Sequence, residues 1–302
     1  MSGKKVIVVT GATGAQGGSV VRFLLEDGTF SVRGVTRNAN SDKAKELAAK
    51  GVEVVTANLH DIESVKKAFT GAYGVFGVTN FWDPNEGGSE KEIAQGKNLV
   101  DAAKATGISH FVWSTLDNTA PIHAVHWDSK AQVDDYLKAS GVPRTSLYTA
   151  FYYENFATFF KLAKNADGGL EANWPPVMLS DGPLGMYAVE DTGAWVLEAF
   201  KNPTEWVGKD IRVIAEVVTP RAAAKTLSDI LGKPVKLAEV NEEAFESTKD
   251  IPQLKELYYN NKWFYHNKGS PNRDPEQTRK IYPKVQSFET WAKAHINELV
   301  PQ

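Results

Sequence analysis

Residues 11–17 read Gly11-Ala12-Thr13-Gly14-Ala15-Gln16-Gly17, and they come shortly after the apolar run Val6-Ile7-Val8-Val9. Glycines at this spacing, between a strand and a helix, allow a tight turn and let the backbone approach a pyrophosphate closely. The helix that begins there offers N–H groups and a partial positive charge. The segment therefore predicts a dinucleotide-binding loop whose cofactor contacts are Gly11, Thr13, Gly14, Ala15, Gln16 and Gly17.

The first half of the chain alternates short apolar runs with amphipathic stretches, which is typical of strand–helix–strand units on a parallel sheet. We expect strands at Val6–Thr10, Ser31–Thr36, Val52–Ala57, Tyr73–Val78, His110–Ser114 and Thr145–Thr149. We expect helices at Gly17–Glu26, Asp42–Lys50, Ile62–Phe69, Glu90–Thr106 and Asp128–Ala139. Because crossovers between parallel strands are right-handed, the predicted fold is an α/β Rossmann fold with a doubly wound parallel sheet.

The alternating pattern ends near Ala150, where a stretch rich in aromatic residues begins. Proline and glycine turns cluster at Trp174-Pro175-Pro176 and Asp181-Gly182-Pro183, and later helices begin after Thr219 and Ser287. We therefore expect a Rossmann domain over residues 1–150 and a smaller α+β C-terminal portion over residues 151–302. We expect this portion to be interleaved with the first and to face a substrate or partner.

Composition narrows the class of protein. The 302 residues carry a formal net charge of −3 and no cysteine, so disulfides, thiolate chemistry and Cys-based metal sites are excluded. We expect no metal site, no direct binding of nucleic acid and no membrane span, because no metal-ligand spacing, basic stripe or long apolar run occurs. Without a signal peptide at the N-terminus, we expect a cytoplasmic protein; a nuclear location stays open.

The end of the second predicted strand indicates which dinucleotide is bound. NAD-preferring sites carry an acidic residue there that binds the ribose 2′-hydroxyl, whereas this chain has Arg37. A guanidinium can bind a 2′-phosphate through two hydrogen bonds, so we predict NADP(H) as the cofactor. Positions after the third and fourth strands predict further cofactor contacts at Asn58, Leu59, Thr79, Asn80 and Phe81.

Candidate catalytic residues follow the fifth predicted strand. Short-chain dehydrogenases use a serine after this strand and a Tyr-x-x-x-Lys pair, whose spacing puts both side chains on one helix face. Here Ser114 or Thr115 can take the serine position and Lys130 the lysine position, but the tyrosine position is His126. An imidazole can act as a general acid, so the sequence leaves open whether the protein is an enzyme.

Several motifs together resemble the NmrA-like family of atypical short-chain dehydrogenase/reductases, and in particular its redox-sensing, NADP-binding members. The matching segments are Gly11–Gly18, Arg37, Val78–Trp82, His126–Lys130, Phe151–Phe156 and Val189–Gly193. The resemblance implies that NADP(H) is held by the glycine loop, Arg37, the turn at Thr79–Phe81, Lys130 and the segment Tyr153, Glu154 and Asn155. It also implies a role in sensing the NADPH/NADP⁺ ratio and passing it to a regulatory protein partner.

Three functions remain open at this point. The first is an NADP(H)-binding redox sensor or regulator with weak or no turnover, as the missing tyrosine favours. The second is an NADPH-dependent reductase of quinones, phenolics or enones. The third is a protein that binds flat aromatic metabolites in a pocket lined by its many aromatic side chains. Phe156, Phe159 and Phe160 have helical spacing and are expected to belong to the core instead.

Overall fold

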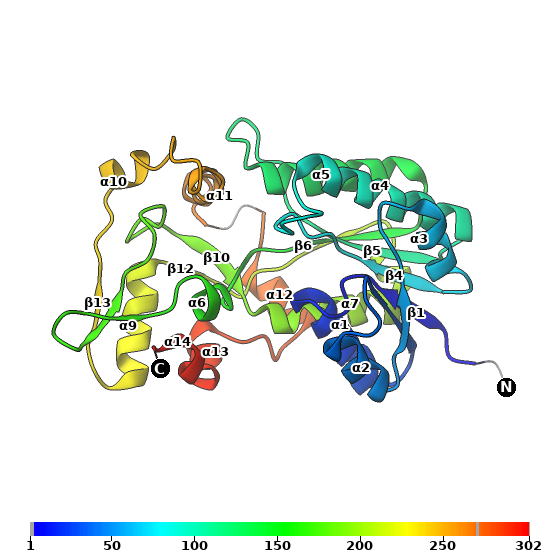
Figure 1. The fold of residues 1–302 in the computed structure, drawn as a ribbon, viewed down its shortest axis with the longest axis horizontal. Helices are drawn as coiled ribbons and strands as arrows, with labels where there is room; N and C mark the ends of the chain where they lie inside the picture. The colour runs from blue at the N-terminus through cyan, green and yellow to red at the C-terminus, as the bar shows by residue number, and fades with distance from the viewer. Residues whose placement is uncertain (1–2, 270–271, 302) are drawn as a thin grey trace. The chain divides into compact units, whose positions relative to one another are not determined.

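The computed structural model describes residues 3–269 and 272–301, which form two compact units (Figure 1). The first unit contains the chain up to Asn118, together with Val125–Thr149 and Glu190–Ile211. The second contains Thr119–Ala124, Ala150–Val189 and the chain from Arg212 onward. The segment Glu190–Ile211, which falls in the C-terminal portion proposed from sequence, therefore belongs to the first unit.

A seven-stranded sheet forms the centre of the first unit, with the strand order β11-β6-β5-β4-β1-β2-β3. The six strands from β1 to β6 are parallel to their neighbours, which confirms the predicted doubly wound Rossmann sheet. The strands are β1 (Val6–Val9), β2 (Ser31–Thr36), β3 (Glu53–Thr56), β4 (Gly74–Gly77), β5 (His110–Thr115), β6 (Arg144–Tyr148) and β11 (Asp210–Arg212).

Helices cover both faces of this sheet, and Figure 1 shows α3, α4 and α5 on one face and α1, α2 and α7 on the other. Strands covered on both faces are expected to be apolar throughout, as β1 and β4 are. The helices of this unit are α1 (Ala15–Asp27), α2 (Asp42–Ala49), α3 (Ile62–Phe69), α4 (Ser89–Thr106), α5 (Val125–Ser140), α7 (Thr192–Lys201) and α8 (Pro203–Trp206).

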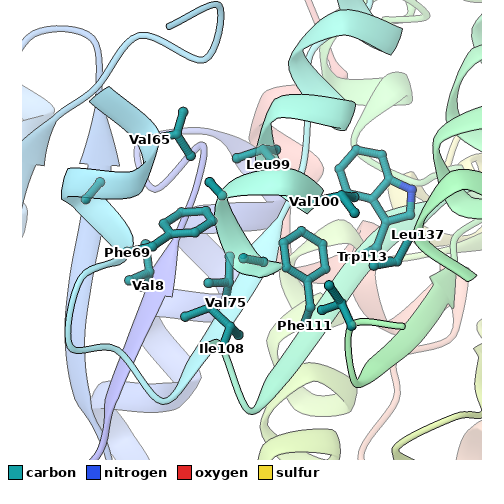
Figure 2. Close-up of a cluster of buried hydrophobic side chains, with 14 of the residues drawn as sticks. Val8, Val65, Phe69, Val75, Leu99, Val100, Ile108, Phe111, Trp113 and Leu137 are labelled. Atoms are coloured by element: carbon teal, nitrogen blue, oxygen red, sulfur yellow. The ribbon is translucent and has the colours of Figure 1, made fainter. Parts of the chain in front are cut away.

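One part of the hydrophobic core lies between the sheet and helices α3, α4 and α5. Helices α4 and α5 approach closely at Gly96, where an added Cβ would lie 2.5 Å from a methyl of Val133. This contact fixes the distance between the two helices that carry the candidate polar residues described below. Figure 2 shows the cluster, including Val8, Val65, Phe69, Val75, Leu99, Val100, Ile108, Phe111, Trp113 and Leu137.

The second unit contains two three-stranded sheets and several short helices. One sheet has the order β12 (Glu216–Val218), β10 (Leu184–Tyr187), β7 (Phe151–Tyr152), and the other β13 (Val235–Leu237), β9 (Leu170–Ala172), β8 (Ala163–Lys164). A 3₁₀ turn, η1 (Val189–Asp191), leads from this unit into the first. The helices are α6 (Asn155–Thr158), α9 (Pro220–Leu231), α10 (Glu242–Glu246), α11 (Lys255–His266), α12 (Pro275–Ile281), α13 (Phe288–Ala294) and α14 (Ile296–Leu299).

The predicted core position of Phe159 is wrong. Phe156 and Phe160 are buried, but Phe159 is 78% exposed. The helical spacing does not hold there because α6 ends at Thr158. The buried ring of Phe156 packs against Trp174 and Phe288 in the core of the second unit.

A buried histidine makes the stability of the first unit depend on pH. His110 is fully buried in β5, with its ring against Phe200. Its Nε2 lies 2.8 Å from the Thr145 hydroxyl, which donates its proton to the carbonyl of Trp206. Nε2 therefore carries the imidazole proton, and Nδ1 has no hydrogen-bond partner among the described residues. Protonating Nδ1 would place a charge in the core, and burial lowers the pKa of His110 from 6.5 to about 4.

We expect acid to destabilise the protein through His110. Between pH 6.5 and about 4 the unfolded state binds the proton and the folded state does not, so stability rises with pH. The contribution is fully present above pH 6.5, and about 3 kcal/mol of it is lost as pH falls toward 4. Urea unfolding across this range should give a flatter profile for His110→Gln. The exposed His266→Gln serves as the control, and an unchanged slope in His110→Gln would contradict the assignment.

Candidate functional site

The glycine loop connects β1 to α1, where the sequence analysis expects it. Gly11 has a φ of +58°, and the N–H of Gly14 donates to the Gly11 carbonyl at 2.9 Å. A Cβ on Gly17 would lie 2.1 Å from that carbonyl oxygen, so only glycine allows α1 to begin this close to the loop. Within the described part of the chain, no side chain caps α1 at Gly14, and its first turn has no acidic residue. The loop and helix end thus form a cradle with positive character that suits an anion.

Arg37 follows β2, and its side chain is 68% exposed. Its Nη1 donates to Oδ2 of Asp83 at 2.8 Å, and Asp83 lies in the turn after β4. The other carboxylate oxygen of Asp83 accepts from the backbone N–H groups of Glu86 and Asn85. These two backbone donors, and then the Arg37 guanidinium, lower the pKa of Asp83. The side chain predicted to bind a 2′-phosphate therefore has a fixed carboxylate as its partner.

Two of the predicted contact positions, Asn58 and Asn80, stabilise their own turns. The Asn58 side-chain oxygen accepts from the N–H of His60 at 3.0 Å, and that of Asn80 accepts from Trp82 at 3.1 Å. Both asparagines are exposed. Leu59 is half-buried against the hydrophobic core of Figure 2. Their roles toward a cofactor stay predictions.

Lys130 is part of a buried polar network between α4, α5 and the end of β4. Its ammonium donates to Oε1 of Glu92 at 2.6 Å, and to the carbonyl and hydroxyl oxygens of Thr79 at 3.1 and 3.2 Å. Thr79 in turn donates its hydroxyl proton to Glu92 at 2.8 Å. The second oxygen of Glu92 accepts from Ser129, and the Glu92 side chain is fully buried. A buried carboxylate is thus matched by an ammonium and two hydroxyl donors.

Glu92 was not among the site residues predicted from the sequence. The residues of α4 that face the core are Glu92, Gln95, Gly96, Leu99, Val100, Ala102 and Ala103. Glu92 thus occupies a core position of a helical pattern, which is unusual for an acidic residue without a buried partner. That placement was the available signal, although it does not identify Lys130 as the partner.

The two other candidate catalytic residues also have partners in the first unit. The His126 ring lies 5.7 Å from the ring of Phe81 and 5.1 Å from that of Trp82, measured between centroids. Ser114 is buried at the end of β5, and its hydroxyl donates to the side-chain oxygen of Gln16 at 2.7 Å. Ser114 therefore supports the glycine loop. Catalytic roles for His126 and Ser114 stay predictions.

The remaining predicted contacts, Tyr153, Glu154 and Asn155, belong to the second unit. The Tyr153 side chain is fully buried, and its hydroxyl donates to Glu216 at 2.7 Å. The carboxylate of Glu154 accepts from the N–H of Val189 at 2.9 Å. The Asn155 carbonyl accepts from the N–H groups of Phe159 and Phe160. These contacts stabilise the local fold, and the cofactor role of the three residues stays a prediction.

The described residues contain neither a candidate metal site nor a candidate membrane-spanning helix. No group of three or more His, Cys, Asp or Glu side chains in these residues could hold a metal ion. No helix in the same part of the chain has the length and apolar character needed to cross a membrane.

The parallel sheet, the glycine loop after β1 and the uncapped start of α1 define a protein with a Rossmann-type fold. Comparison with known proteins then identifies the family. Residues 3–292 match the model of the NmrA-like family, and the chain belongs to this family.

Similar proteins include two relatives in sequence and one protein of known structure. An NmrA-like family domain-containing protein of Dictyostelium discoideum is 27% identical, over 96% of this chain and 97% of its own. An NmrA-like family domain-containing oxidoreductase of Aspergillus campestris is 31% identical, over 77% of this chain and 75% of its own. Among solved structures, the negative transcriptional regulator NmrA in complex with NAD is 25% identical, with a TM-score of 0.81 over 98% of this chain and 97% of its own. NmrA has also been solved in complex with NADP.

Proposed function

We propose that this protein binds NADP(H) and acts as a redox sensor or regulator with little catalytic turnover. The observation that carries the proposal is the contrast between a well-formed cofactor cradle and a lysine whose donors are already engaged. The similarity to NmrA, which is described as a transcriptional regulator and binds both NAD and NADP, supports the same interpretation.

The residues of the loop fit a dinucleotide. The N–H groups at the start of α1 can receive the pyrophosphate, and the exposed Gly11, Gly14 and Ala15 leave the backbone open to it. Arg37 carries the exposed guanidinium that can bind a 2′-phosphate. When bound, a nicotinamide ring would supply a hydride donor or acceptor.

Lys130 is poorly placed for proton transfer. A protonated lysine has three N–H donors, and the three acceptors described above, on Glu92 and Thr79, match that number. To bind a ribose hydroxyl or to lower the pKa of a catalytic acid, the ammonium would have to break one of these bonds. Because Glu92 is buried, breaking the ion pair would leave its charge poorly compensated. The network therefore favours a structural role for Lys130 over catalysis.

The proposal is tested by measuring binding and turnover on the same preparation. Calorimetric titration with NADPH and NADP⁺ should give dissociation constants of about 10 μM or tighter, with unequal values for the two forms as a ratio sensor requires. Oxidation of NADPH with quinone or enone substrates should fall well below the usual enzyme range of about 1–10³ per second. Equal affinities, or turnover within that range, would refute the sensor.

The second candidate is an NADPH-dependent reductase of quinones, phenolics or enones. It is favoured by the position of His126, one helical turn before Lys130 on α5, and by the similarity to proteins named as oxidoreductases. If the protein is such a reductase, it should oxidise NADPH with quinone or enone substrates, and this turnover should be lost in His126→Ala.

A further inference from the structure

The ion pair between Arg37 and Asp83 crosses the edge of the sheet where the glycine loop begins. Arg37 directly follows β2, Asp83 lies in the turn after β4, and β1 lies between these two strands. The glycine loop leaves β1 at the same carboxyl edge. The pair thus joins the two sides of the loop within the first unit.

The two partners are held very differently. The Asp83 side chain is only 11% exposed, and one of its carboxylate oxygens accepts from Asn85 and Glu86 at 3.0 and 2.9 Å. The turn is closed by hydrogen bonds from Gly87 to the Asp83 carbonyl and from Gly88 to the Phe81 carbonyl. A Cβ on Gly87 would lie 2.2 Å from the Phe81 carbonyl oxygen, so only glycine fits at this point of the turn. The carboxylate is therefore fixed, and the exposed arginine reaches toward it.

This arrangement places a permanent anion where the cofactor's 2′-phosphate needs the guanidinium. Arg37 uses one nitrogen for Asp83, which leaves other N–H donors of its planar group for a second acceptor. A 2′-phosphate must either share Arg37 with the carboxylate or displace it, and in both cases two negative groups come close together. A dinucleotide with a free 2′-hydroxyl brings no such charge, and the ion pair can stay intact.

We propose that Asp83 is a specificity-determining residue that acts as a built-in counter-ion of Arg37 and reduces the preference of the site for NADP(H) over NAD(H). This inference rests on the proposed function, since it assigns the specificity of the same dinucleotide site. It predicts a protein that binds both cofactors, with a smaller difference between them than Arg37 alone would produce.

The test compares the affinities for NADP⁺ and NAD⁺ in the full chain by calorimetry. In Asp83→Asn the side-chain oxygen can still accept from Asn85 and Glu86, so the turn is kept while the charge is removed. We expect NADP⁺ to bind about 5- to 10-fold more tightly. The Asp83 carboxylate both neutralises the Arg37 guanidinium and repels the 2′-phosphate, and charge interactions near a protein surface have energies of this size. NAD⁺ should change by less than about twofold, because it carries no 2′-phosphate.

Two further variants separate this mechanism from a general charge effect. Glu86→Gln removes a negative charge from the same turn without touching Arg37, and salt screening should limit its effect to about twofold. In an Arg37→Ala background, Asp83→Asn should lose most of its effect on NADP⁺, since the competition for the guanidinium is gone.

The outcomes distinguish this inference from the proposed function. Two results would overturn the role of Asp83 and leave the proposed function intact. Either the ratio of NADP⁺ to NAD⁺ affinity is unchanged in Asp83→Asn, or it changes by the same factor in Glu86→Gln. Weaker NADP⁺ binding in Asp83→Asn also overturns this role, because the carboxylate would then orient Arg37 for the phosphate. If the unmodified protein binds neither dinucleotide, both the inference and the proposed function fall.

Discussion

Replacing Glu92 by glutamine is expected to lower the free energy of unfolding by about 3–5 kcal/mol, the usual cost of breaking a buried ion pair from one side. The substitution keeps the size of the side chain but leaves the Lys130 ammonium, whose side chain is 11% exposed, without a counter-charge. It also turns one of the acceptor oxygens of Glu92 into an amide donor that faces the donors of Lys130, Thr79 or Ser129. In a thermal melt the change corresponds to a fall in the midpoint temperature of about 5–10 °C.

Two comparisons make this result specific to the ion pair. Glu90→Gln removes an exposed charge from the first turn of the same helix and should change stability by no more than about 0.5 kcal/mol. The double variant Glu92→Leu/Lys130→Met removes both charges, and it should recover most of the loss because no unpaired charge remains. A double variant that is as unstable as Glu92→Gln would show that the hydroxyl contacts, and not the ion pair, hold the network together.

Local patterns were sufficient to predict six of the seven strands in the sheet of the first unit, β1 to β6. The strand Ser31–Thr36 and the helix Ile62–Phe69 have the predicted bounds, and the other predicted elements differ at their ends by a few residues. Asp61 explains the accuracy at α3, because its side chain caps the helix by accepting from Glu63 and Ser64. Buried strands and capped helices are short-range features, so the sequence of each segment is enough to predict them.

The sequence led us to expect interleaving of the two portions, but the segment that returns to the first unit, Glu190–Ile211, could not be predicted in the same way. Helix α7 packs against α1 at Gly193, where an added Cβ would lie 2.4 Å from the Ser19 carbonyl oxygen. Strand β11 has only three residues, Asp210–Arg212, and two of them are charged. From its own sequence, α7 does not differ from an ordinary helix, and β11 does not differ from an ordinary loop.

The candidate site shows the same division. The glycine loop, Arg37 and Lys130 were selected from sequence because their residue types and spacing are characteristic of dinucleotide sites. Their acidic partners Asp83 and Glu92 were not, since these pairs join residues 46 and 38 positions apart. The core position of Glu92 in α4 is visible in the helical pattern, but which residues pair with one another over such distances leaves no periodic signal.

Replacing Gly17 by alanine is expected to weaken dinucleotide binding by at least about 100-fold, or about 2.7 kcal/mol. The new Cβ would lie 2.1 Å from the oxygen and 2.5 Å from the carbon of the Gly11 carbonyl, and 2.9 Å from the nitrogen of Ala12. These are backbone atoms of the loop, so no side-chain rotation can relieve the contact. Either the loop or the start of α1 must move, and the N–H groups that would receive the pyrophosphate move with it.

Helix α1 cannot withdraw freely, because its other side is fixed to the segment that begins at Glu190. The Ser19 hydroxyl donates to the Glu190 carbonyl at 2.5 Å and accepts from the N–H of Gly193 at 2.9 Å. The strain in Gly17→Ala therefore falls on the loop itself. Titration with NADP⁺ and NAD⁺, at a temperature where circular dichroism shows the variant folded, separates lost binding from lost structure.

The adjacent Gly18 provides the matched control. A Cβ at this position would lie 3.7 Å from the Ala12 carbonyl oxygen, an ordinary contact, and the residue is inside α1. Gly18→Ala should keep dinucleotide affinity within about threefold and raise stability by about 0.5–1 kcal/mol, because alanine is the better helix former. If Gly17→Ala binds both dinucleotides as tightly as Gly18→Ala does, the loop does not hold the pyrophosphate, and the cofactor site must be sought elsewhere in the chain.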